Sequence, residues 1–150
     1  MGKNFDVAAY KAPTNIYMNN GAKYAGECTA YCWGRAYEVM RGSHNLPTGD
    51  AGTWFKAKHG YLTGQIPKAT SIGCFTGHVI FIEDYDEDTD MLRFSEANYY
   101  AKTDSRFNNG KWEPEKANTN NTDGLIQEKT FSELKKRTGG GTFQGFIYLV

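Results

Sequence analysis

Four residues have side chains that together could carry out nucleophilic catalysis. Cys28 lies where a helical pattern begins, His78 precedes an apolar, β-branched segment, and Glu96 and Asn98 alternate along the next apolar segment. A thiolate is the attacking form of cysteine, and a helix N-terminus favours that anion. An imidazole can take the thiol proton and pass it to a leaving amine if a third group fixes its orientation. These are the parts of a thiol hydrolase.

A β-hairpin could bring the imidazole and the two polar groups together. Residues 79–85 and 91–99 predict two strands joined by an acidic turn. With the turn centred midway between them, His78 faces Asn98, and Glu96 lies diagonal to it on the same face. A slip of one residue in this register would move both polar groups to the other face.

The remaining pattern predicts an α+β domain, in which helices come first and antiparallel strands follow. Residues 1–23 form an N-terminal arm, and apolar residues at spacings of three and four predict a helix over 26–40 that holds Cys28 in its first turn. The other expected elements are a helix over 51–58, a surface loop over 102–123, a strand over 125–129, a helix over 131–137 and a strand over 143–150.

Length, charge and cysteine count exclude several classes. A chain of 150 residues suits one domain, and 17 basic residues balance 17 acidic ones, so no basic excess points to nucleic acid. No apolar run reaches membrane-spanning length, and the N-terminus shows no secretory signal. Three cysteines do not make a paired disulfide framework, and Cys32 and Cys74 are expected to be reduced and buried.

Three segments, taken in order, resemble the motifs of one hydrolase family. Residues 26–33, Gly-x-Cys-Thr-x-Tyr-x-Trp, resemble the nucleophile motif of the CHAP family, the cysteine- and histidine-dependent amidohydrolases/peptidases. Residues 77–83 resemble its histidine strand, and residues 95–99 its Ser-Glu-x-Asn-aromatic strand. The resemblance covers about residues 24–150.

The resemblance implies a papain-like fold of the NlpC/P60–CHAP type, with N-terminal helices packed on an antiparallel sheet. It also implies hydrolysis of an amide bond in bacterial peptidoglycan, with Cys28 as nucleophile, His78 as general base and acid, and Glu96 as orienting group. Asn98 would support the imidazole further. Three aromatic residues are candidates for lining a substrate groove, with a packing role as the equal alternative: Trp33, Trp54 and Tyr99.

Members of this family occur as phage lysins, bacterial autolysins and secretion-system effectors. A phage endolysin is the expected type, made in the host cytoplasm and acting on the cell wall after release. Peptidoglycan is the expected partner, with neither nucleic acid nor membrane, and a cell-wall-binding module could be separate. No cofactor is expected, because residues 19–24 lack the carboxylates that calcium prefers, and the acidic run over 84–90 is interpreted as a solvated turn.

Three alternatives stay open. Cys28 and Cys32, four apart on a helix, could hold a structural zinc ion with His78 or Cys74. The chain could be a wall-binding module without activity. An NlpC/P60 endopeptidase shares the order of cysteine and histidine but usually has a second histidine in place of the Glu-x-Asn pair. The same catalytic parts suit both an N-acetylmuramoyl-L-alanine amidase and an endopeptidase.

Overall fold

A six-stranded antiparallel sheet with short helices beside it forms the body of the protein. The structure is a computed structural model that describes residues 7–10, 12–18, 27–42, 44–97, 107–108, 111–112, 122–137 and 139–150. The predicted α+β class is therefore confirmed. Within these ranges, no helix has the length and apolar character needed to cross a membrane.

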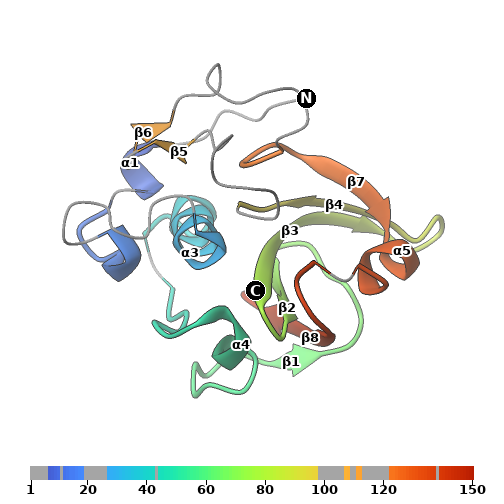
Figure 1. The fold of residues 1–150 in the computed structure, drawn as a ribbon. Helices are drawn as coiled ribbons and strands as arrows, with labels where there is room; N and C mark the ends of the chain where they lie inside the picture. The colour runs from blue at the N-terminus through green and yellow to red at the C-terminus, as the bar shows by residue number, and fades with distance from the viewer. Residues whose placement is uncertain are drawn as a thin grey trace.

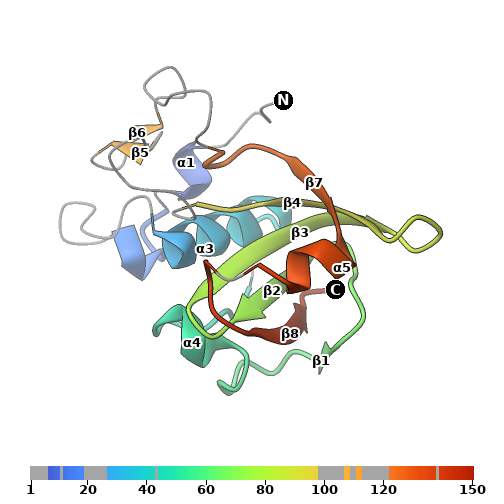
Figure 2. The ribbon, with the colours of Figure 1, turned by 45° about the vertical axis from the view of Figure 1, so that its right-hand side comes forward.

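The helices and strands alternate little along the chain (Figures 1 and 2). The helical segments are α1 (Val7–Tyr10), the 3-10 turn η1 (Ile16–Met18), α3 (Cys28–Val39), α4 (Ala51–Trp54) and α5 (Phe131–Lys135). The strands of the large sheet are β1 (Thr63–Gly64), β2 (Ser71–Phe75), β3 (His78–Asp86), β4 (Met91–Ser95), β7 (Gln127–Thr130) and β8 (Phe143–Tyr148), in the order β1-β8-β2-β3-β4-β7. A separate pair consists of β5 (Phe107–Asn108) and β6 (Lys111–Trp112).

Both faces of the sheet are covered, which explains why β2 and β3 read as nearly continuous apolar runs. On one face, Val79 and Phe81 share a core with residues of α3 and α4. On the other face, Ile80 and Ile82 share a second core with residues of α5 and β8. Figure 1 shows α3 on one side of the central strands and α5 on the other.

The β3–β4 hairpin has the predicted register in the part of its pairing that is farthest from the turn. Phe81 pairs with Ser95 and Ile82 with Phe94, as a turn centred midway between the strands requires. A β-bulge between Ile82 and Asp84 then shifts the pairing by one residue towards the turn. The uniform register predicted for the outer half of the hairpin is therefore wrong.

Several sequence-based element boundaries needed correction. The N-terminal arm contains α1 and η1. The backbone of α1 lies so close to α3 that a Cβ at Gly34 would come within 2.8 Å of the Tyr10 Cα, so this position in α3 requires glycine. The helix expected over 51–58 ends at Trp54, and β2 was not predicted. The loop expected over 102–123 includes the short pair of β5 and β6.

Candidate active site

Cys28 is the first residue of α3, in a wall of a cleft. Its N-cap is Glu27, whose side chain makes no capping hydrogen bond, and the first-turn N–H groups of a helix lack intrahelical partners. Cys28 is only 8% exposed, but it lines a cleft of about 760 Å³. The other lining residues come from η1, the start of α3, the segment before α4, α4 itself and the β2–β3 turn: Ile16, Tyr17, Glu27, Thr29, 48–53, Thr76 and Gly77.

His78 begins β3 beside this cleft, and it contacts both of the groups that a catalytic imidazole needs. Its Nε2 lies 2.7 Å from Oε1 of Glu96, and the ring is also hydrogen-bonded to the thiol of Cys28. Because Nε2 faces the carboxylate, Nδ1 is the ring nitrogen left for the sulfur. Burial disfavours the charged ring, but the hydrogen bonds to Cys28 and Glu96 outweigh it and raise the pKa of His78 to about 9. The ring therefore holds a proton readily, as a group that is to accept the proton of a thiol must.

Glu96 follows directly after β4 and is fully buried. Besides His78, its carboxylate accepts two hydrogen bonds from Arg137, each 2.8 Å long, and one of 2.9 Å from Gln127 Nε2. Burial opposes ionisation of this carboxyl, but Arg137 and His78 overcome it and lower the pKa of Glu96 to about 2. The carboxylate is thus ionised at neutral pH, and a donor meets each of its oxygens.

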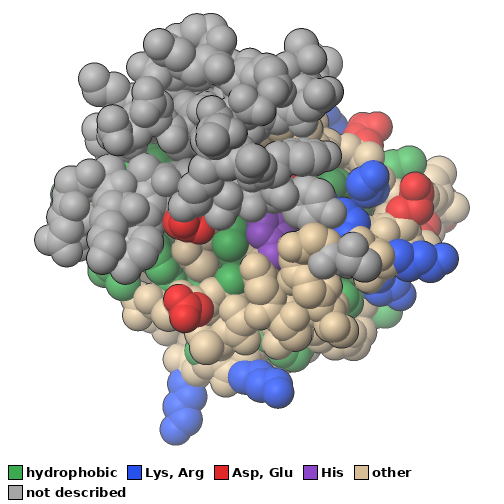
Figure 3. Space-filling model, viewed as in Figure 1, with side chains coloured by type: hydrophobic (Ala, Val, Ile, Leu, Met, Phe, Trp, Pro, Cys, Tyr) green, Lys and Arg blue, Asp and Glu red, His purple; other side chains and the backbone are tan. Residues whose placement is uncertain are grey.

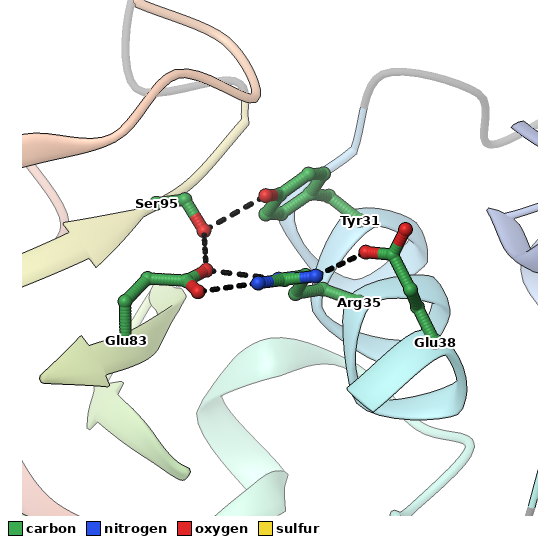
Figure 4. Close-up of polar contacts among 5 residues, drawn as sticks. All are labelled: Tyr31, Arg35, Glu38, Glu83 and Ser95. Atoms are coloured by element: carbon green, nitrogen blue, oxygen red, sulfur yellow. Dashed lines mark hydrogen bonds and ion pairs between the residues drawn. The ribbon is translucent and has the colours of Figure 1, made fainter. Parts of the chain in front are cut away.

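A polar network ties α3, which carries the thiol, to the strands that carry the imidazole and carboxylate (Figure 4). Arg35 of α3 donates to both oxygens of Glu83 on β3, at 3.0 and 2.6 Å, and also contacts Glu38. The hydroxyl of Tyr31 donates to Ser95 Oγ at 2.8 Å, and Ser95 Oγ donates to Glu83 at 2.7 Å. Since Ser95 precedes Glu96 and Tyr31 lies one turn after Cys28, this network fixes the separation of the reacting groups.

The C-terminal part of the chain also shapes the site. The backbone N–H of Gly77 donates to the carbonyl of Gly140 at 3.0 Å, which brings the loop before β8 against His78. A Cβ at Gly140 would lie 2.6 Å from the Cβ of His78, so only glycine fits there without displacing the histidine. Neither Gly140 nor Arg137 was predicted as a site residue. Arg137 follows two lysines in a stretch that looks like an exposed helix end, and the sequence carried no signal for it.

The structure describes two of the three candidate aromatic residues. Trp54 is fully buried, and its Nε1 donates to the carbonyl of Gly49 at 3.0 Å and to the hydroxyl of Tyr17 at 3.2 Å. Trp33 is 7% exposed and stacks on Tyr37. Neither indole is among the residues that line the cleft, but Trp54 supports its wall through the hydrogen bonds to Gly49 and Tyr17. Asn98 and Tyr99 lie outside the described residues.

The described parts of the chain contain no group of three or more His, Cys, Asp or Glu side chains placed to hold a metal ion. The zinc alternative therefore has no complete set of ligands among them. Residues 19–24, where the sequence argued against calcium, fall outside the described ranges.

The cleft presents acidic and apolar groups around the histidine. Among its described lining residues are the carboxylates Glu27 and Asp50, and none of these residues is a lysine or arginine. Figure 3 shows a histidine side chain on this face with hydrophobic and acidic side chains beside it.

Comparison with known families agrees with this geometry. The model of the CHAP domain matches residues 17–98, which is more than half of the chain, so the chain belongs to the CHAP domain family. Membership points to amidase or peptidase activity, with peptidoglycan as the substrate. No curated protein matches the chain.

Proposed function

We propose that this protein is a cysteine-dependent peptidoglycan hydrolase that uses Cys28, His78 and Glu96. The observation that carries the proposal is the placement of His78, which contacts the thiol on one side and a buried carboxylate on the other, beside a cleft. A glutamate occupies the position where an NlpC/P60 enzyme would usually have its second histidine, which favours the CHAP type of site.

The chemistry follows from these contacts. His78 takes the proton of Cys28, and the thiolate adds to the carbonyl carbon of an amide, which places negative charge on the carbonyl oxygen. The free N–H groups of the first turn of α3 are suited to bind that oxygen. When the C–N bond breaks, His78 gives its proton to the leaving amine and a thioester remains. Water, deprotonated by His78, then adds to the thioester, and its collapse releases the carboxylic acid and restores the thiol.

The wider context belongs to the same proposal. We infer a papain-like arrangement of one domain over residues 1–150, with residues 1–23 as an arm over it. The proposed role is that of a phage endolysin that acts on the wall after release, alone or with a separate wall-binding module. Asn98 is proposed as a further support of the imidazole and Tyr99 as a substrate contact.

Fragments released from defined peptidoglycans, identified by mass spectrometry, test the proposal. The wild type and Cys32→Ala, which removes a fully buried thiol one turn from Cys28, are expected to release the same fragments. Cys28→Ala is expected to release none. Fragments in which the alanine N-terminus is freed from the sugar would define an amidase, and an N-terminus within the peptide would define an endopeptidase. Undiminished release by Cys28→Ala would refute the proposal.

A further inference from the structure

The carboxylate of Glu96 is held by a part of the chain that lies outside the family match. That match ends at residue 98, whereas Gln127 and Arg137 come from β7 and from the segment after α5. The two guanidinium nitrogens Nη1 and Nη2 of Arg137 each donate to a different oxygen of Glu96 at 2.8 Å. Such a bidentate pair fixes the plane of a carboxylate as well as its position.

Arg137 is itself held firmly. Its side chain is only 9% exposed, and its guanidinium lies over the rings of Phe75 and Phe94, with 5.9 and 5.6 Å from Cζ to the ring centroids. Its backbone N–H donates to the carbonyl of Leu134, which is fully buried in the core beneath α5. The guanidinium group is therefore held in place by α5 and the core. Arginine side chains are mostly exposed, and a buried one is usually paired with an acidic group.

The start of α5 is anchored as well. Thr130 caps it by accepting the N–H of Glu133 at 3.1 Å, and Asp90 in the β3–β4 turn accepts hydrogen bonds from the N–H and hydroxyl of Ser132. The position of Arg137 thus depends on the same hairpin that carries His78 and Glu96.

We propose that Arg137 is a positioning residue, whose guanidinium holds the carboxylate of Glu96 in the orientation and ionisation state that keep the His78 ring directed at Cys28. This inference rests on the proposed function. Without Arg137, Glu96 would keep the hydrogen bonds of Gln127 and His78, but it could rotate about its side-chain bonds and would lose its buried counter-charge. Both changes would loosen the ring that must face the sulfur.

The charges around Glu96 set the expected pH dependence. The titratable and charged groups around Glu96 are His78 from β3, Arg137 from the segment after α5, and Cys32 of α3. Asp123 is buried next to Gly124, whose N–H donates to the Glu96 carbonyl. Arg137 is the permanent cation of this set. Its removal lets burial raise the pKa of Glu96, so the carboxylate is lost at a higher pH than in the wild type.

The rate at which iodoacetamide alkylates Cys28 tests this without any wall substrate. Cys32 and Cys74 are fully buried, and peptide mass analysis assigns the modified thiol. We expect Arg137→Met to slow alkylation of Cys28 at pH 7 about tenfold, because the His78 ring would face the sulfur in a smaller fraction of the molecules. In the pH profile of the alkylation rate, we also expect the fall on the acidic side to begin at a higher pH in Arg137→Met than in the wild type, because the pKa of Glu96 is raised. Arg137→Lys keeps the positive charge but cannot make the two parallel hydrogen bonds to Glu96. In this variant, alkylation of Cys28 should be slower than in the wild type, but the rate should fall at the same acidic pH.

The matched control is Arg93→Met, which removes an exposed arginine paired with Glu128 on the same sheet and should behave as wild type. Circular dichroism establishes that each variant is folded. If Arg137→Met does not fold, Arg137→Lys decides alone, because alkylation at the wild-type rate by that variant would overturn the proposal. A folded Arg137→Met with the wild-type rate and pH profile would overturn it too. A wild type that alkylates in this way but releases no wall fragments would instead refute the hydrolase assignment.

Discussion

Replacement of Glu96 by glutamine is the most informative single change in this site. Every partner of the carboxylate is a donor: His78, the two nitrogens of Arg137, and Gln127. A glutamine side chain has one oxygen and one NH₂ group, so at least one donor would then face another donor. The variant also leaves the cation of Arg137 buried without its counter-charge.

The size of the effect follows from the ionisation of Glu96. A carboxyl whose pKa falls from 4.5 to about 2 on folding contributes about 3 kcal/mol of stability once the pH is above 4.5. Because the folded-state pKa is the lower one, that contribution disappears as the pH falls towards 2, and less than half of it remains at pH 3. Glutamine cannot ionise, so the variant lacks this contribution at every pH.

Urea unfolding at pH 6 and at pH 3 measures the difference. We expect Glu96→Gln to be about 3 kcal/mol less stable than the wild type at pH 6, and this difference to fall to less than half at pH 3. Glu128→Gln is the control, since that glutamate is 60% exposed and its pair with Arg93 at 3.4 Å should contribute less than about 1 kcal/mol. A gap for Glu96→Gln that is equally large at both pH values would show that lost packing, and not charge, causes it, and would refute the reasoning.

Two further changes test how the reacting groups are held. Gly140→Ala places a methyl group against the Cβ of His78, and it should lower the rate of hydrolysis about 100-fold because it displaces the ring. The added methyl group of Gly77→Ala meets only an ordinary contact of 3.5 Å, so the rate of that variant should stay near that of the wild type. Equal rates for the two variants would contradict the steric argument. Arg35→Met removes both hydrogen bonds to Glu83 and should reduce the free energy of unfolding by about 1.5–3 kcal/mol in urea, and an unchanged midpoint would show that the network of Figure 4 does not hold α3 on the sheet.

Local patterns in the sequence predicted the parts of the fold that depend on near neighbours. The period of three and four residues placed α3 within two residues of its observed start, and a turn centred midway between the two predicted strands gave the correct pairing of Phe81 with Ser95. The bulge after Ile82 was not predictable, because β3 is buried on both faces up to Ile82, so this part of the sequence has no alternation that could mark an extra residue.

The site was predictable only as far as its motifs extend. Cys28, His78 and Glu96 lie in recognisable segments, and the structure brings these three side chains into contact. Arg137 and Gly140 belong to the site through contacts between distant parts of the chain, which no local pattern encodes. The same limit applies to Trp54, since an aromatic side chain that lines a groove and one that packs behind it look alike in a sequence.

The position of β8 in the sheet has a consequence for how the protein folds during its synthesis. Although β8 follows the other five strands of its sheet in the sequence, it lies between β1 and β2, so the central sheet cannot close until residues 143–148 have left the ribosome. A nascent chain carries Cys28 and His78 long before this point, yet Gly140 cannot lie against the imidazole until β8 has inserted. Any activity of this site should therefore appear only after residues 143–148 have been made, in one step and not gradually as the chain lengthens.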